Sequence, residues 1–185
     1  FEGRLRRSGG IGFFHYGGHG VQVGGRNYLI PVDAEISDES RVVTRALDVE
    51  EVTSSMEQSG ARASIVVLDA CRDNPLPRVG TRGATRGLAA VERRPKNSVI
   101  VYAADAGCSA RDGVFTPALS RHLRSTDLTL SQVLTKVRKE VFEETKGQQS
   151  PGSYNQLFEE IYLVADLPSG LVGSGREPVG RGESE

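Results

Sequence analysis

The chain has 185 residues, of which 37% are hydrophobic and 25% are charged, and its formal net charge at pH 7 is −1. This composition is typical of one soluble globular domain, and a charge near zero argues against nucleic acid or an anionic membrane as a partner. No stretch approaches the roughly 18 apolar residues of a membrane-spanning helix. The two cysteines, Cys71 and Cys108, are either a buried thiol pair or one disulfide. Such a low density favours a reducing, cytoplasmic compartment over a disulfide scaffold.

The first part of the chain is predicted to contain a strand, a short extended segment and a helix. Residues 11–16 form the first apolar run and are predicted to be a buried strand. Residues 27–30 are extended, because a proline follows them. A helix is predicted over residues 47–58, since Asp48 and Glu51 have the spacing of a capping box.

The middle of the chain combines two strands with a long loop. Residues 64–70 are nearly all apolar and β-branched, which is typical of a strand covered on both faces. Residues 72–97 hold six arginines with prolines and glycines and show no periodicity, so they are predicted to be a loop. Residues 98–103 form the next predicted strand.

The last third is predicted to contain two helices and a final strand. The first helix spans residues 114–123. Thr129 begins the second helix, with Gln132 at capping-box spacing, and Gly147 ends it. Residues 160–164 are predicted to be the last strand.

The order of these elements predicts the fold class. Strands that alternate with helices and long connections indicate an α/β domain, with a mainly parallel sheet between helices on both faces. Residues 1–166 are expected to form this three-layer domain. Residues 167–185, rich in proline, glycine, serine and charge, are expected to be a disordered tail.

The candidate functional residues are His19 and Cys71, because each lies just past an apolar run predicted to be a strand. The carboxyl ends of neighbouring parallel strands share one edge of a sheet, and ligands bind at that edge. A thiol and an imidazole at this edge are the components of a cysteine nucleophile and its acid–base partner.

These residues also have other interpretations. A single cysteine is most often a small buried hydrophobe, and a single histidine among glycines is most often a loop residue. A zinc site from His15, His19, Cys71 and Cys108 fits no common zinc spacing. The glycine-rich stretch lacks the Lys-Ser/Thr of a phosphate-binding loop.

Two segments resemble the catalytic blocks of the caspase-like cysteine peptidases, residues 15–20 (HYGGHG) and residues 68–75 (LDACRDNP). Cys71 follows His19 by about 50 residues, the separation in the caspase signature. The closer resemblance is to the bacterial branch, the metacaspase-like or orthocaspase proteins. It extends over roughly residues 1–165, with supporting similarity at residues 27–33, 86–89, 102–113 and 115–119.

The resemblance implies a catalytic role for each matching residue. Cys71 is the implied nucleophile and His19 the implied general base and acid. The backbone N–H groups of Gly20 and Cys71 are implied as the oxyanion hole, for which glycines permit close approach of the backbone. His15 is expected to be structural and His122 to be solvated.

The resemblance also implies cleavage after Arg or Lys rather than after Asp. An acidic pocket is needed to pair the substrate's cation. Asp69 is the implied pocket carboxylate, with Asp105 and Asp112 as candidates to complete it. The alternative role for Asp69 is capping of nearby backbone N–H groups. Cys108 stands where the family often has Gln. The expected partners are protein or peptide substrates with basic residues at the cleavage site.

The arginine-rich loop of residues 72–97 has two interpretations. A charged loop is usually a solvated one. An Arg-specific peptidase with arginines in a loop next to its own site can also cleave itself there, so the loop is a candidate junction between a large and a small segment.

The first strands of the family sheet, which come before the histidine strand, have no counterpart in this sequence. An upstream fragment or a partner is therefore expected to complete the sheet, because its edge would otherwise be unprotected. For the same reason a catalytically inactive caspase-like interaction module is the alternative function.

No cofactor is predicted. Calcium dependence occurs among metacaspase relatives, and an acidic run leaves calcium binding open without predicting it, because its spacing is not that of an EF-hand. The run consists of Asp33, Glu35, Asp38 and Glu39.

Overall fold

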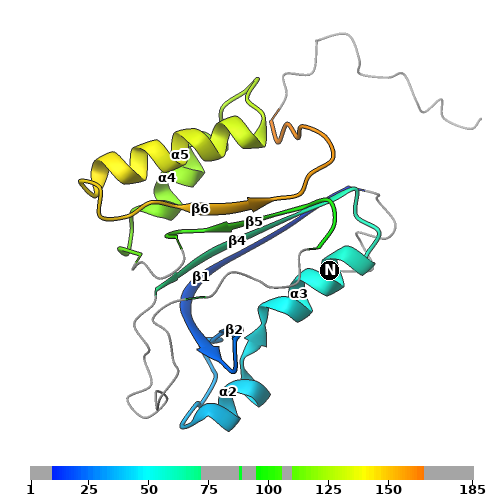
Figure 1. Ribbon diagram of the computed structural model, residues 1–185, viewed down its shortest axis with the longest axis vertical. Helices are drawn as coiled ribbons and strands as arrows, with labels where there is room; N and C mark the ends of the chain where they lie inside the picture. Colours follow the sequence, from blue (N-terminus) through cyan, green and yellow to red (C-terminus); the bar gives the residue numbers. More distant parts are fainter. Residues whose placement is uncertain (1–9, 72–87, 89–94, 106–109, 165–185) are drawn as a thin grey trace, which may run out of the picture.

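The structure is a computed structural model that describes residues 10–71, 88, 95–105 and 110–164, with Cys71 described by its backbone (Figure 1). A six-stranded sheet has the order β3-β2-β1-β4-β5-β6. Its strands are β1 (Ile11–Val23), β2 (Arg26–Leu29), β3 (Leu47–Asp48), β4 (Ala63–Cys71), β5 (Ser98–Tyr102) and β6 (Gly152–Asn155). The helices are α2 (Glu39–Arg45), α3 (Val49–Gln58), α4 (Phe115–His122) and α5 (Leu130–Glu144).

The centre of the sheet is parallel and both of its sides are antiparallel. Strands β1, β4 and β5 run parallel, while β2, β3 and β6 pair antiparallel with their neighbours. Figure 1 shows α4 and α5 on the opposite side of the sheet from α3. The predicted α/β class, with a sheet between helices on both faces, is therefore confirmed.

Strand β4 is buried on both faces, as its apolar sequence predicts. Ile65 and Val67 face a cluster that contains Phe115 of α4 and the apolar side of α5. Val66 and Leu68, which alternate with them, face the cluster on the side of α3. Each of these β4 side chains is at most 1% exposed. Burial of such side chains contributes about 1.5–3 kcal/mol each, so β4 is the centre of the core.

Strand β1 is longer than the prediction of residues 11–16. It continues through its glycines to Val23 and turns directly into β2, with Val23 paired to Arg26. Gly24 and Gly25 make the turn with φ of 58° and 82°. Two adjacent positive φ values are the requirement of a tight hairpin turn, and glycine meets it without strain.

Helix α2 was not predicted, and the helix predicted over residues 47–58 begins later, at Val49. Asp38 caps α2 by accepting a hydrogen bond from the backbone N–H of Arg41. Hydrogen bonds from Ser40 and Ser37 lower the pKa of Asp38 to about 2. Residues 47–48 instead pair with β2, because Asp48 is extended as the N-cap of α3.

The prediction of a last strand at residues 160–164 is wrong. That segment makes one isolated bridge, between Thr129 and Tyr162, and buries Ile161 in the cluster under α5. The last strand is β6, which pairs antiparallel with β5. The predicted helix after Thr129 is confirmed, including the reciprocal hydrogen bonds of its capping box with Gln132.

Two further features bear on the predictions. β1 pairs with β4 over Ile11–His19 and with β2 over Gly20–Val23, so within the described ranges the first part of β1 has no strand on its other side. None of the helices in these ranges has the length and apolarity that crossing a membrane requires. Most of the loop 72–97 and the tail 167–185 lie outside the described residues.

Candidate active site

The two candidate catalytic residues are neighbours across one pair of strands. His19 and Cys71 are Cα partners in the parallel register of β1 and β4, and they form the last pair of that ladder. Two positions earlier Gly17 pairs with Asp69. The structure therefore brings the backbones of His19, Asp69 and Cys71 together at the carboxyl ends of the two strands, where the sequence analysis expected them.

The backbone at His19 is held from the side of β2. The N–H of Ile30 donates to the carbonyl oxygen of His19 at 2.9 Å. The Tyr16 hydroxyl lies 2.8 Å from both carbonyl oxygens, those of His19 and Ile30, and can donate its one hydrogen to either. Burial raises the pKa of Tyr16, so the phenol keeps this hydrogen at neutral pH. The imidazole of His19 is exposed.

The direction of the Gly20 N–H follows from the same contact. The described peptide bonds include no cis bond, and in a trans peptide the C=O of one residue and the N–H of the next point in opposite directions. The His19 carbonyl points at Ile30. The Gly20 N–H therefore points away from β2 and towards the β4 side of the strand. That is the direction required of an oxyanion donor for a nucleophile on β4.

Two glycines of this segment, Gly18 and Gly20, leave no room for side chains. A Cβ on Gly18 would lie 2.7 Å from the Tyr16 hydroxyl oxygen. A Cβ on Gly20 would lie 2.8 Å from Leu88 Cδ2 and 3.1 Å from Ala70 Cβ. The backbone before and after His19 thus packs against its neighbours at distances that only glycine permits.

Asp69 is held by a threonine that the sequence analysis did not single out. The Thr116 hydroxyl, on α4, donates to Asp69 Oδ2 at 2.5 Å. The same Thr116 oxygen lies 3.3 Å from His15 Nε2. Asp69 and Thr116 are both partly buried. The only sequence signal for Thr116 was its place in the segment of residues 115–119, which resembles the family. His15 therefore belongs to a hydrogen-bonded chain that ends at Asp69.

The other two predicted pocket carboxylates make different contacts. The N–H of Asp105 donates to the carbonyl oxygen of Ser150 at 2.8 Å, and its Oδ1 would lie 3.3 Å from a Cβ on Gly152. Asp105 is therefore next to β6, whereas Asp69 is on β4 and pairs with Gly17 of β1. Asp112 is exposed in the turn before α4. Cys108 lies outside the described residues.

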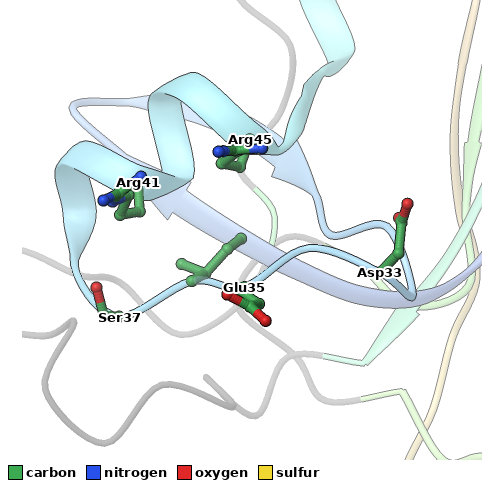
Figure 2. Close-up of a pocket in the computed structure, with 6 residues that line it drawn as sticks. Asp33, Glu35, Ser37, Arg41 and Arg45 are labelled. Carbon is green, nitrogen blue, oxygen red and sulfur yellow. The ribbon is translucent and has the colours of Figure 1, made fainter.

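Two cavities lie near this edge of the sheet. The first, of about 330 Å³, is next to His19 and is lined mainly by apolar residues of the loop after β2. The second, of about 470 Å³, lies between that loop and α2. Figure 2 shows Arg41 and Arg45 coming from α2, and Asp33 and Glu35 from the loop. The described residues that line this second cavity carry exposed charges of both signs, but they include no cysteine and no histidine that could form a second catalytic pair.

The next feature is the capacity of the described residues to bind a metal ion. Among the described residues there is no group of three or more His, Cys, Asp or Glu side chains arranged to hold a metal ion.

The prediction that His122 is solvated is wrong, because its Nε2 lies 2.6 Å from Glu140 Oε2. Glu140 also accepts a hydrogen bond from Arg121, and these donors, Arg121 foremost, lower its pKa.

Comparison with known families decides the classification. Residues 4–162 match the family described as Caspase domain. The chain belongs to the caspase domain family. This is a family of cysteine peptidases, and the matched span includes both His19 and Cys71. The family resemblance expected from the sequence is thus confirmed. No curated protein matches the chain significantly.

Proposed function

We propose that this caspase domain is a cysteine endopeptidase of the metacaspase-like or orthocaspase branch, which cleaves after Arg or Lys. The observation that supports it most directly is the pairing of His19 with Cys71 at the end of the β1–β4 ladder. Two residues far apart in sequence, of the two types that the chemistry needs, meet at the edge where α/β sheets bind ligands.

The proposed reaction has two stages. His19 takes the proton of the Cys71 thiol, and the sulfur attacks the carbonyl carbon of the scissile bond while the N–H groups of Gly20 and Cys71 stabilise the negative oxygen. His19 then gives its proton to the leaving nitrogen, the C–N bond breaks and an acyl-enzyme remains. In the second stage water adds to the acyl carbon and passes its proton to His19. The C–S bond breaks, His19 returns the proton to the Cys71 sulfur, and the acid product leaves the regenerated thiol.

Asp69 supports the proposed basic specificity. Its carboxylate lies two positions before the nucleophile on the same strand, and Thr116 engages one of its two oxygens, Oδ2. We expect the substrate's guanidinium or ammonium group to approach Oδ1. Asp105 and Asp112 are proposed to complete the acidic pocket, and the protein is proposed to need no cofactor.

Three further properties belong to the proposal. Self-cleavage is proposed in the arginine-rich loop after Cys71. A further strand, from an upstream segment or a partner, is proposed to pair with the first part of β1, because β2 covers only its last residues. The low cysteine content supports a cytoplasmic location.

Peptide hydrolysis by matched variants tests the activity. Peptides with Arg, Lys or Asp before the scissile bond are assayed with wild type, Cys71→Ala and His19→Ala. Cleavage after Arg and Lys, lost in both variants, is the expected result. Hydrolysis that persists in Cys71→Ala would overturn the proposed nucleophile, and a preference for Asp would overturn the proposed pocket.

Alkylation separates the peptidase from an inactive interaction module. That alternative is favoured by the first part of β1, which has no strand on its other side among the described residues. In a Cys108→Ala background, iodoacetamide reports on Cys71 alone. A catalytic thiol should react at a lower pH than a free thiol, whose pKa is about 8.5. His19→Ala should then move the reaction midpoint upward. An identical midpoint in both proteins, together with no hydrolysis, would favour the inactive module.

A further inference from the structure

The cavity next to His19 has apolar walls. Residues 16–19 of β1 form one side. The other side consists of side chains from the loop after β2, namely Ile30, Pro31, Val32, Ala34 and Ile36. Of the described residues that line it, none is Asp, Glu, Lys or Arg. The charged residues of the same loop, Asp33 and Glu35, line the neighbouring cavity instead (Figure 2). Ile36 is common to both cavities.

This cavity and the nucleophile lie on opposite sides of His19. The sheet order places β4 on one side of β1 and β2 on the other. His19 pairs with Cys71 on the β4 side, and its carbonyl accepts from Ile30 on the β2 side. A peptide that crosses the site from β4 towards β2 therefore passes Cys71, then His19, and then the cavity.

The chemistry of the proposed peptidase fixes the direction of that peptide. The carbonyl carbon of the scissile bond must be at Cys71, where the acyl-enzyme forms. The nitrogen of the same bond must be within reach of His19, which protonates it as it leaves. The residue that carries this nitrogen is consequently on the side of His19 away from Cys71.

We infer, on the basis of the proposed peptidase function, that this cavity binds the side chain of the residue directly after the scissile bond, and that it selects an apolar side chain. Its volume of about 330 Å³ is at the lower end of the roughly 300–1,000 Å³ of ligand pockets. That size is ample for one apolar side chain.

The walls of the cavity are held in place before substrate binds. The Tyr16 hydroxyl, 2.8 Å from the carbonyl oxygens of both His19 and Ile30, ties β1 to the loop. Ile30 and Ile36 also pack against the buried cluster of Val21, Tyr28 and Val42. Val32, in contrast, is fully exposed, so an apolar substrate side chain that covers it removes apolar surface from water.

Peptides that differ only after the scissile bond test the inference. Internally quenched peptides carry Arg before the bond and Leu, Val, Asp or Lys after it. Wild type is expected to cleave the Leu and Val peptides with a kcat/KM at least roughly tenfold above the Asp peptide, the scale of discrimination in apolar pockets. Val32→Asp is expected to reduce that ratio severalfold and to improve cleavage of the Lys peptide.

Val43→Asp is the matched control. Val43 is also an exposed valine, on α2, and it does not line the cavity, so its ratio should equal that of wild type. Equal cleavage of all four peptides, or equal effects of the two variants, would overturn the inference and leave the peptidase intact. No cleavage of any peptide would overturn the peptidase and the inference together.

Discussion

Thr116 and Asp69 join helix α4 to strand β4 through a hydrogen bond of 2.5 Å between Oγ1 and Oδ2. The bond fixes the orientation of a carboxylate that lies two positions before Cys71. Because His15 contacts the same threonine oxygen at 3.3 Å, a residue of β1 also belongs to this arrangement. The proposed specificity of the site thus depends on a helix that contributes no residue to the catalytic pair.

Thr116→Val is expected to weaken binding of basic substrates. The substitution keeps the shape of the side chain but removes the hydroxyl, and a hydrogen bond to a charged group contributes about 1.5–3 kcal/mol. We expect KM for an Arg peptide to rise roughly tenfold with a much smaller change in kcat. Steady-state kinetics measures both constants.

Two controls make the role of Thr116 specific. Thr116→Ser retains the hydroxyl and should restore most of the affinity. Thr135→Val removes an exposed hydroxyl that bonds to the Ser131 carbonyl within α5, so it should leave KM unchanged. A uniform loss of kcat in Thr116→Val, with KM constant, would contradict a positioning role.

Gly20→Ala is expected to lower stability by about 1–3 kcal/mol, the typical cost of overpacking. Its Cβ would be 2.8 Å from Leu88 Cδ2 and 3.1 Å from Ala70 Cβ. Gly17→Ala is the control, because its Cβ would make an ordinary contact of 3.7 Å with His15. Urea unfolding gives both values. The cost of Gly20→Ala should be smaller when Leu88 has already been replaced by Ala. If that cost is the same in the Leu88→Ala protein as in wild type, the clash with Leu88 is not the cause.

Thr129→Ala is expected to destabilise the protein by about 1 kcal/mol. It removes the cap at the N-terminus of α5, where Thr129 and Gln132 satisfy each other's backbone N–H groups. Thr135→Ala in the middle of the same helix is the comparison and should change stability by a few tenths of a kcal/mol at most. Thermal and urea unfolding measure the difference, and equal effects at the two positions would argue against the cap.

Glu140→Gln should make stability less dependent on acid pH. Hydrogen bonds from Arg121 and His122 lower the pKa of Glu140 below its ordinary value of 4.5. A carboxylate with a lowered pKa in the folded state stabilises the fold above that ordinary value, and this contribution disappears as pH falls through the folded-state pKa. Wild type should therefore exceed Glu140→Gln in stability at pH 7, and the gap should shrink below about pH 4.5.

Glu143→Gln is the comparison for Glu140→Gln. Glu143 has a distant partner, Lys139, at 3.9 Å and both side chains are exposed, so the effect of its substitution should be small at every pH. Unfolding by urea at a series of pH values provides the data. A gap between wild type and Glu140→Gln that is constant from pH 7 to pH 3 would rule out the linkage.

Elements with a strong local pattern were predictable from the sequence. The apolar, β-branched run of β4 predicts a central strand, and the Thr129 and Gln132 pair predicts the start of α5. The extension of β1 was not predictable, because its glycines favour no strand and the extension depends on pairing with β4 up to His19 and with β2 from Gly20 onward. The same holds for β6, a short edge strand of Gly, Ser, Tyr and Asn whose positions are alternately half-buried and exposed, and whose place in the sheet depends on pairing with β5.

Part of the candidate site was likewise predictable from the sequence, and part was not. His19 and Cys71 stand at the ends of apolar runs, so the sequence indicates that they meet at one edge of the sheet. The partner of Asp69 is 47 residues away along the chain, and no local pattern connects it with Thr116. Likewise, the cavity next to His19 forms only when the loop after β2 folds back on β1.

The change of partner within β1 has a mechanical consequence. The strand pairs with β4 as far as His19 and with β2 from Gly20 onward, so the histidine lies at the junction between two β-ladders. A force that tilts the β1–β2 hairpin against the rest of the sheet bends the chain at this junction. A ligand that displaces the β1–β2 hairpin would therefore also move the backbone of His19.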